Sequence, residues 1–168
     1  ALYNYLGAAY AALRDHGNAI LNYKKSINLN PCFAEGYNNI AVTYKTISEF
    51  DKAIKFFDKS ISLKADYHVA MLNKANCFEA MGDLTKAIEI YKEILKQNPN
   101  FNEALKNIGF LIQRVEFLAH DPDIYEILEI LITRGNYVRP KDIAHSITSL
   151  LKNDPIVRTL ITNNKKQE

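Results

Sequence analysis

Three asparagines recur at one interval and are the side chains of this sequence best suited to recognition chemistry. Asn39, Asn73 and Asn107 lie 34 residues apart. A carboxamide carries both a hydrogen-bond donor and an acceptor. Each asparagine can therefore pair with the N–H and C=O groups of one residue in an extended peptide, whatever that residue's side chain. The spacing predicts recognition of a peptide backbone, provided that the fold places these residues on one surface.

The other polar residues form no catalytic pattern. The acid pairs Asp121/Asp123 and Glu126/Glu129 fall at a predicted helix start and on a polar helix face. The sequence has no Gly-rich phosphate loop and none of the motifs GxSxG, HExxH or GxGxxG. The histidines lack metal-ligand spacing; they are His16, His68, His120 and His145. We therefore expect a chain that is no enzyme by itself and that binds no cofactor and no metal.

Composition narrows the class of partner. Of the 168 residues, 48% are hydrophobic and 24% charged, as in ordinary globular proteins, and the net charge of +2 gives no reason to expect a nucleic-acid partner. Cys32 and Cys77 form no CxxC motif, so we expect reduced thiols and a cytoplasmic protein. No apolar run reaches the roughly 18 residues of a membrane span. Because the chain starts at Ala1 inside a repeat, we expect it to be part of a longer protein.

The 34-residue interval also governs the apolar residues. Within each unit they recur at steps of three and four, which predicts two amphipathic helices per unit. Small residues let paired helices approach to about 8–10 Å, and aromatic residues fill the space beside them. The small column is Gly7, Ala41, Ala75 and Gly109, and the second-helix columns are Ala19, Ala53, Ala87 and Tyr23, Phe57, Tyr91. The predicted helices are 2–14, 18–30, 35–47, 51–64, 69–81, 85–97 and 102–118.

These columns closely resemble the tetratricopeptide repeat (TPR) family. The residues that carry the likeness in the first unit are Tyr3, Leu6, Gly7, Tyr10, Ala19, Tyr23, Ser26 and Pro31. It covers 1–100 as three units, with departures at Ala65, Met71, Lys74 and Ile94. The resemblance implies an all-α fold: a right-handed TPR superhelix of three full repeats plus a partial fourth in 1–120. A C-terminal helical cap or connector then follows in 121–168.

In that family the first helices line a concave groove, so the resemblance implies that the three asparagines form a ladder along it. Helices about 10 Å apart and a strand rise of about 3.3 Å per residue would let each rung meet roughly every third peptide residue. In TPR proteins related to O-linked sugar transferases, asparagines of this column hold peptide backbone. Further expected peptide-binding residues are Asn38, Asn76, Lys45, Leu72, Glu79, Lys106, Phe110 and Arg114.

Two observations limit this interpretation. The alternative, in which the asparagines only bond the adjacent helix, stays open, and the first unit interrupts the ladder with Tyr5, having Asn4 one place earlier. The carboxylate clamp that some family members use for chaperone C-termini needs Lys and Asn in the first unit and more basic residues after them. Asn4 and Ala8 occupy those positions here, so we expect no such clamp.

The segments "IYEILEILI", "PKDIAHSITSLL" and "PIVRTLI" predict three C-terminal helices. Asp121-Pro122 and Asp154-Pro155 each look like an N-cap followed by proline at the first helical position. Two apolar faces should cover the helix at 102–118: Ile124, Ile127, Leu128, Leu131 and Ile143, Ile147, Leu150, Leu151. We expect 121–152 to cap the array and 154–168 to act as a connector.

The favoured function is a protein–protein interaction module that binds an extended peptide segment. The alternative is the substrate-recruiting N-terminal part of a larger bacterial enzyme, of the protein methyltransferase or O-linked glycosyltransferase type. Residues 137–161 faintly resemble helices that precede a methyltransferase domain in some bacterial TPR proteins. The residues that carry this likeness are Arg139, Pro140, Asp142, Ile143, Leu150, Leu151, Asp154 and Pro155. The expected partner is a protein or peptide, not a nucleic acid or a membrane.

Overall fold

The computed structural model describes residues 1–115, 121–134 and 140–155, and the regular structure of these residues is entirely helical. The chain divides into two compact units, Ala1–Ile90 and Tyr91–Glu168, and each is described by itself. Helix α6 (Leu84–Gln97) runs across the division. Among the described residues, no helix is both long enough and apolar enough to cross a membrane.

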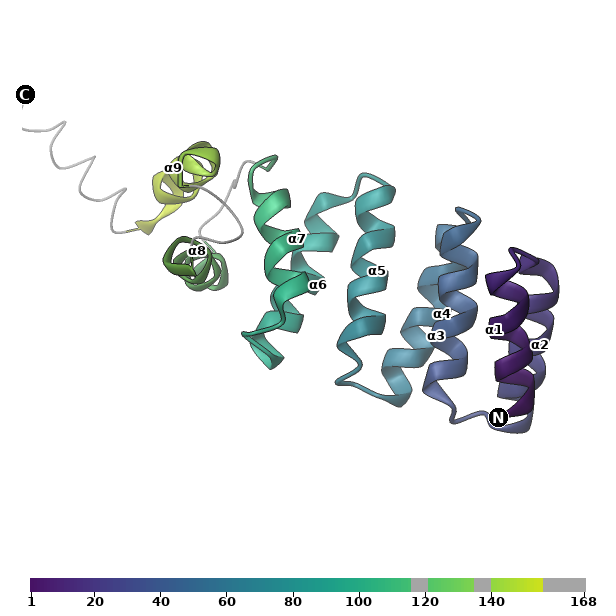
Figure 1. The fold of residues 1–168 in the computed structure, drawn as a ribbon. Coiled ribbons are helices and arrows are strands. Elements are labelled where there is room, and N and C mark those ends of the chain that lie inside the picture. The colour runs from purple at the N-terminus through teal and green to yellow at the C-terminus, as the bar shows by residue number, and fades with distance from the viewer. Residues whose placement is uncertain (116–120, 135–139, 156–168) are drawn as a thin grey trace, which may run out of the picture. The chain divides into compact units, whose positions relative to one another are not determined.

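The first unit consists of helix pairs in the predicted register. Helix α1 (Leu2–Ala12) pairs with α2 (His16–Leu29), and α3 (Ala34–Thr46) pairs with α4 (Phe50–Leu63). Helix α5 (His68–Ala80) then precedes the start of α6. Figure 1 shows α1 to α5 lying side by side, coloured from purple to teal. The bounds of these helices, and those of α6, differ from the predicted ones by at most two residues.

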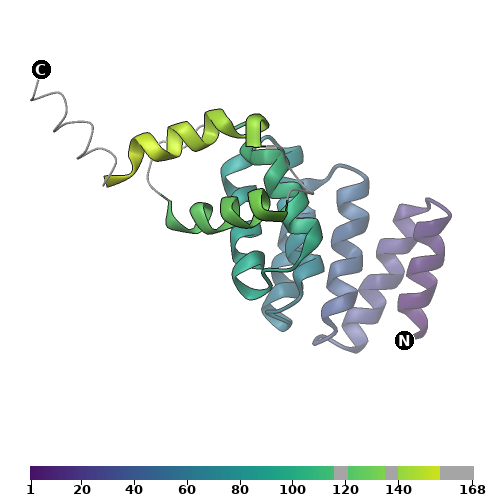
Figure 2. The ribbon, with the colours of Figure 1, turned by 60° about the vertical axis from the view of Figure 1, so that its left-hand side comes forward.

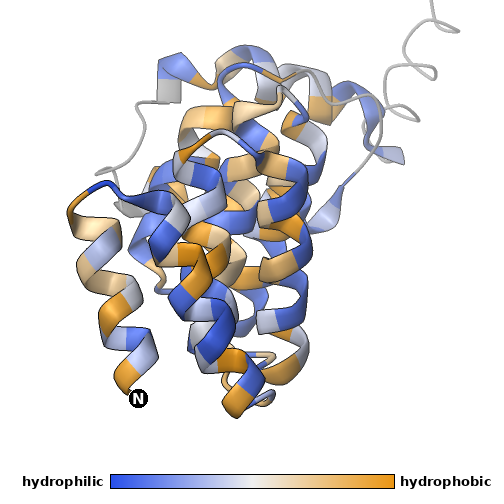
Figure 3. Ribbon diagram, turned by 90° about the vertical axis from the view of Figure 1, so that its right-hand side faces the viewer, coloured by the Kyte–Doolittle hydropathy of each residue, from blue (hydrophilic) through white to orange (hydrophobic). Residues whose placement is uncertain are grey.

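The small-residue column has the steric role that its spacing predicts. A Cβ atom added to Gly7 would lie 2.5 Å from Cδ1 of Tyr23, closer than two atoms can approach. In the second repeat, Ala41 and Phe57 are both fully buried in one cluster. Apolar and polar residues are interspersed along the helices, as the orange and blue bands of Figure 3 show.

Each first helix of this unit ends in the same turn. The N–H of Asp15 donates to the Tyr10 carbonyl, that of Glu49 to Tyr44, and that of Asp83 to Phe78, each at 2.9 Å. Together with a bond from the preceding residue, this is the Schellman motif, whose C′ residue takes a left-handed conformation. The C′ residues lie one repeat apart, with φ of 60° at Arg14, 62° at Ser48 and 83° at Gly82. Only the third repeat places the preferred glycine there.

The second unit contains α7 (Asn102–Ile112), α8 (Pro122–Arg134), a 3₁₀ turn η1 (Pro140–Asp142) and α9 (Ala144–Asn153). Figure 2 shows α8 in green running beside α9 in yellow-green. The backbone N–H of Ile124 donates to Asp121 Oδ1 at 3.3 Å, which confirms the predicted cap before Pro122. All four predicted apolar residues of α8 are buried. In α9, however, Leu151 is 40% exposed, so the predicted face is only partly correct.

Helix α7 is shorter than predicted, ending at Ile112 and not at 118. The Ser146 hydroxyl of α9 lies within hydrogen-bond distance of the backbone carbonyls of Ile112 and Val115 and shares its one proton between them, and the Gln113 side chain donates to the Gly109 carbonyl. Side chains thus satisfy acceptors that further helical N–H groups would have used. The spacing of apolar residues does not reveal these side-chain hydrogen bonds, so it could not predict where α7 ends.

Two predictions concern the C-terminal part of the chain. The third predicted C-terminal helix, at 155–161, and the proposed connector lie almost wholly outside the described residues. The boundary between an array at 1–120 and a cap or connector at 121–168 stays a prediction.

The left-handed column predicts a stabilising substitution. Ser48→Gly should raise the free energy of unfolding by about 0.5–1 kcal/mol, because a Cβ is unfavourable at positive φ. Gly82→Ser is the reciprocal control and should lower it by a similar amount; a Cβ there would meet no atom within 4 Å, so only the backbone is affected. Urea unfolding measures both. A loss of stability in Ser48→Gly would mean that the glycine's gain in unfolded-chain entropy is the larger effect.

The two thiols should differ sharply in reactivity. Burial raises the pKa of Cys77 to about 11, although the nearby Lys45 ammonium opposes the shift, whereas Cys32 is exposed. At pH 8 only about one in a thousand Cys77 side chains would be thiolate, the reactive form. Iodoacetamide should therefore label one thiol in the folded protein and two in urea. Equal labelling of both thiols without denaturant would contradict the buried position of Cys77.

Candidate functional site

The first two asparagines of the column bond neighbouring first helices. Asn39 lies half-buried on α3, and its Nδ2 donates to Oδ1 of Asn4 on α1 at 3.0 Å. Asn73 lies half-buried on α5, and its Oδ1 accepts a 2.6 Å hydrogen bond from Nζ of Lys45 on α3. The open alternative, bonding to the adjacent helix, is thus what the described contacts of these two residues show.

Each of these two side chains keeps one polar atom unengaged. The Oδ1 of Asn39 and the Nδ2 of Asn73 have no partner among the described residues. Because α3 and α5 are in direct contact, a free acceptor and a free donor lie on neighbouring helices. An extended chain offers complementary groups, a backbone N–H for the acceptor and a backbone C=O for the donor.

The third asparagine belongs to the second unit and has a different environment. Asn107 on α7 donates from Nδ2 to the hydroxyl of Tyr91 at 3.2 Å. The corresponding residues 16 positions before Asn39 and Asn73 are Tyr23 and Phe57. Phe57 has no hydroxyl to offer, and Asn39 bonds Asn4 and not Tyr23. Residues of one column thus make three different polar contacts.

The remaining predicted site residues have mixed exposure. Asn38 is only 6% exposed, and its Oδ1 is buried without a hydrogen-bond partner among the described residues, so it is not presented to a ligand in this conformation. The residues of α5, Leu72, Asn76 and Glu79, are half-buried. In the second unit Lys106, Phe110 and Arg114 are exposed, Phe110 by 63%.

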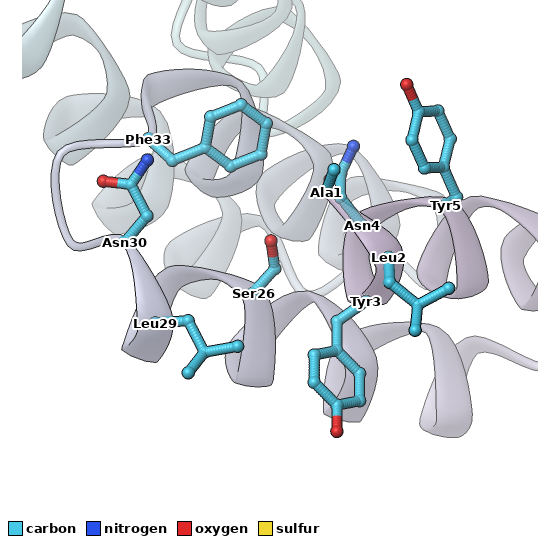
Figure 4. Close-up of a pocket in the computed structure, with 9 residues that line it drawn as sticks. All are labelled: Ala1, Leu2, Tyr3, Asn4, Tyr5, Ser26, Leu29, Asn30 and Phe33. Atoms are coloured by element: carbon cyan, nitrogen blue, oxygen red, sulfur yellow. The ribbon is translucent and has the colours of Figure 1, made fainter.

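Two cavities of the first unit adjoin these helices. One, of about 250 Å³, lies among α1, α2 and α3 and includes Asn39 together with His16 and Tyr23, which the sequence reasoning did not select. The other, of about 540 Å³, is shown in Figure 4. It is bounded by the first residue, Ala1, and by Leu2, Leu29 and Phe33. We place no site there, because its shape depends on the chain terminus.

Of the two acid pairs, Asp121/Asp123 is engaged in ion pairs within the second unit. Lys92 Nζ lies 2.6 Å from Asp121 Oδ2, and Lys96 Nζ lies 2.8 Å from Asp123 Oδ2. The hydrogen bond from Lys96 holds the pKa of Asp123 below its ordinary value, which does not suit a general acid. Across the described residues, no three His, Cys, Asp or Glu side chains gather in a way that could hold a metal ion.

The segments that match known protein families coincide with the repeats. Family models described as tetratricopeptide repeat match residues 1–31, 22–55 and 48–108. No curated protein sequence matches the chain. Several solved structures are similar to it in fold.

The first TPR of Spaghetti (RPAP3), bound to the HSP90 peptide SRMEEVD, is 22% identical over 67% of this chain and 90% of that chain, with a TM-score of 0.63. The N-terminal domain of STI-1 from C. elegans is 25% identical over 66% and 91%, with a TM-score of 0.61. MamA is 23% identical over 98% and 78%, with a TM-score of 0.62. These structures show the same fold as this chain. None of them supports the alternative of an enzyme part or the likeness of residues 137–161 to a methyltransferase connector.

The fold, the three-fold recurrence of the small, aromatic and turn columns and the matching family models agree on one assignment. The chain belongs to the tetratricopeptide repeat family, and its fold is the all-α TPR fold.

Proposed function

We propose that the chain is a protein-interaction module that binds an extended peptide across α1, α3 and α5. The single observation that carries this proposal is the pair of unengaged polar atoms on adjacent helices, Oδ1 of Asn39 and Nδ2 of Asn73. A peptide N–H would donate to the first, and a peptide C=O would accept from the second. The peptide complexes among the similar structures support binding of this general kind.

The intramolecular bonds prepare these two side chains for binding. Asn4 holds the Asn39 carboxamide by its nitrogen, and Lys45 holds that of Asn73 by its oxygen. In each case the opposite atom stays available. Ordering a polar side chain costs about 0.5–1.5 kcal/mol when it happens on binding. Here the fold has already ordered both, so more of the hydrogen-bond free energy contributes to affinity.

Charge distinguishes this site from one built for acidic tails. Lys74 of α5 is paired with Asp58, 2.7 Å away, whereas Lys45 of α3 donates to the neutral carboxamide of Asn73 and has no carboxylate partner among the described residues. Val69, near the start of α5, is 47% exposed and carries no charge. An acidic tail entering here would meet one uncompensated cation, Lys45, which is too few to offset the lost hydration of several carboxylates. The site is therefore better suited to backbone and neutral side chains than to carboxylates.

Removing both asparagines should weaken peptide binding. Linear peptides selected from a random displayed library on the wild-type protein should bind the variant Asn39→Ala/Asn73→Ala about 5- to 150-fold more weakly, because two hydrogen bonds of about 0.5–1.5 kcal/mol each are lost. Fluorescence polarisation of labelled peptides measures the change, and circular dichroism should show unchanged helicity. Asn28→Ala is the matched control, since Asn28 is exposed on α2. Unaltered affinity in the double variant would assign the asparagines a structural role alone.

The acidic peptide SRMEEVD, which is bound by the similar RPAP3 domain, should be a poor ligand. We expect its dissociation constant to be at least about tenfold weaker than that of the selected peptides, because its several acidic groups would face a single uncompensated lysine, Lys45. Polarisation at low and at physiological salt measures it. Tight, salt-sensitive binding that is lost in Lys45→Met would contradict the proposed preference for uncharged segments.

A further inference from the structure

The cavity among α1, α2 and α3 has a lining that the apolar columns do not explain. It measures about 250 Å³ and is lined by Ala11, His16, Tyr23, Asn39, Val42, Thr43 and Thr46. Ala11, Val42 and the ring of Tyr23 form its apolar part. The others bring polar atoms to it, although the space lies beside the core of the first unit. A cavity of this kind holds a small group with a few polar contacts.

Two of the polar groups lack partners. The Nδ1 atom of His16 is buried and makes no hydrogen bond among the described residues. The hydroxyl of Tyr23 makes none either within that part of the chain, whereas the corresponding hydroxyl of Tyr91 accepts from Asn107. Asn39, the residue that could have bonded Tyr23, donates to Asn4. Buried polar groups are normally paired, and the His16 nitrogen can accept a hydrogen bond from a donor that enters the cavity.

The lining also restricts the chemistry of the occupant. The hydroxyls of Thr43 and Thr46 donate to the backbone carbonyls of Asn39 and Val42, so their lone pairs remain as acceptors. Apart from His16, the lining consists of uncharged residues, so a charged group would be desolvated there without an Asp, Glu, Lys or Arg as counter-ion. A purely apolar group would leave His16 and Tyr23 unpaired. A neutral group that both donates and accepts satisfies the cavity best.

We propose that this cavity is the side-chain subsite of the peptide site and takes a hydroxyl or carboxamide side chain, that of Ser, Thr, Asn or Gln. This inference rests on the proposed function, because Asn39 belongs to both: its Oδ1 would accept the backbone N–H of the residue whose side chain enters the cavity. The subsite would make recognition selective, since backbone contacts alone accept any sequence. His16 and Tyr23 would then determine specificity without touching the peptide backbone.

Capped amino acids test the subsite without a known partner. The probe is N-acetyl-asparagine N-methylamide, titrated while the imidazole signals of His16 are followed by NMR. We expect a saturable shift of these signals, also with the capped threonine. The capped leucine and aspartate should bind at least about tenfold more weakly, the difference made by one or two buried hydrogen bonds. Equal binding of the leucine probe, or no shift with asparagine and threonine, would overturn the inference.

Matched variants locate the binding. Ala11→Leu places a larger side chain in the cavity and should weaken the asparagine probe about tenfold or more, whereas Ala12→Leu, on the exposed side of α1, should change it less than about twofold. His16→Leu removes the unpartnered nitrogen and should weaken the asparagine probe as much as Ala11→Leu does. Because this variant has no His16 imidazole, the NMR signals of Tyr23 report binding. It serves as the second variant if Ala11→Leu does not fold. An unchanged dissociation constant in His16→Leu would overturn the assignment.

This test fails separately from that of the proposed function. If Asn39→Ala/Asn73→Ala loses peptide binding but the capped amino acids bind without selectivity, the peptide site is supported and the side-chain subsite is contradicted. Selective probe binding, with no effect of the double variant on selected peptides, would instead leave a small-molecule cavity and contradict the peptide site.

Discussion

The close approach of the two helices within each repeat is the constraint on which the rest of the first unit depends. The Tyr23 ring occupies the space that a Cβ on Gly7 would need, at 2.5 Å, and Ala41 and Phe57 are likewise packed without exposure. Any larger residue in the small column would separate the helices and open the core. Because this contact recurs at a fixed interval, each first helix is brought against the next. The polar column that contains Asn39 and Asn73 therefore owes its position to apolar contacts made elsewhere on the same helices.

The structural and the binding interpretations of the asparagines are compatible. A hydrogen bond at a partly exposed position contributes about 0.5–1.5 kcal/mol to stability, so the Asn39–Asn4 bond is of modest value to the fold. Its second effect is orientation. Since one end of each carboxamide is held by a neighbouring helix, the other end points in a defined direction before any ligand arrives. A residue that ties two repeats together thus also presents a prepared polar atom.

Apolar positions were predictable from the sequence because they repeat, and polar partners were not because they do not. The predicted bounds of α1 to α6 agree with the structure to within two residues, since each column reports one steric requirement several times. Asn39, Asn73 and Asn107 share a column yet bond Asn4, Lys45 and Tyr91, because each neighbourhood offers a different group. The repeating columns do not indicate His16 as a site residue, for the same reason. Its column continues as Phe50 and Leu84, so a polar residue in an otherwise apolar column was the signal that could have revealed it.

The second unit shows what happens where the repeat pattern stops. Ile108, Leu111 and Ile112 of α7 are fully buried, and so are Ile124 and Leu131 of α8, so the apolar surface is covered without a further repeat. Apolar packing alone tolerates sliding and rotation, because it has no direction. Directional contacts supply what it lacks: Ser146 bonds the carbonyl of Ile112 at the end of α7, and Lys92 pairs with Asp121 at the start of α8. The Lys92 side chain is only 16% exposed, so this ion pair is less screened by solvent than one on an open surface. A few such polar contacts orient the helices of this unit. Because these contacts do not recur at the 34-residue interval, the repeating positions of the sequence could not predict them.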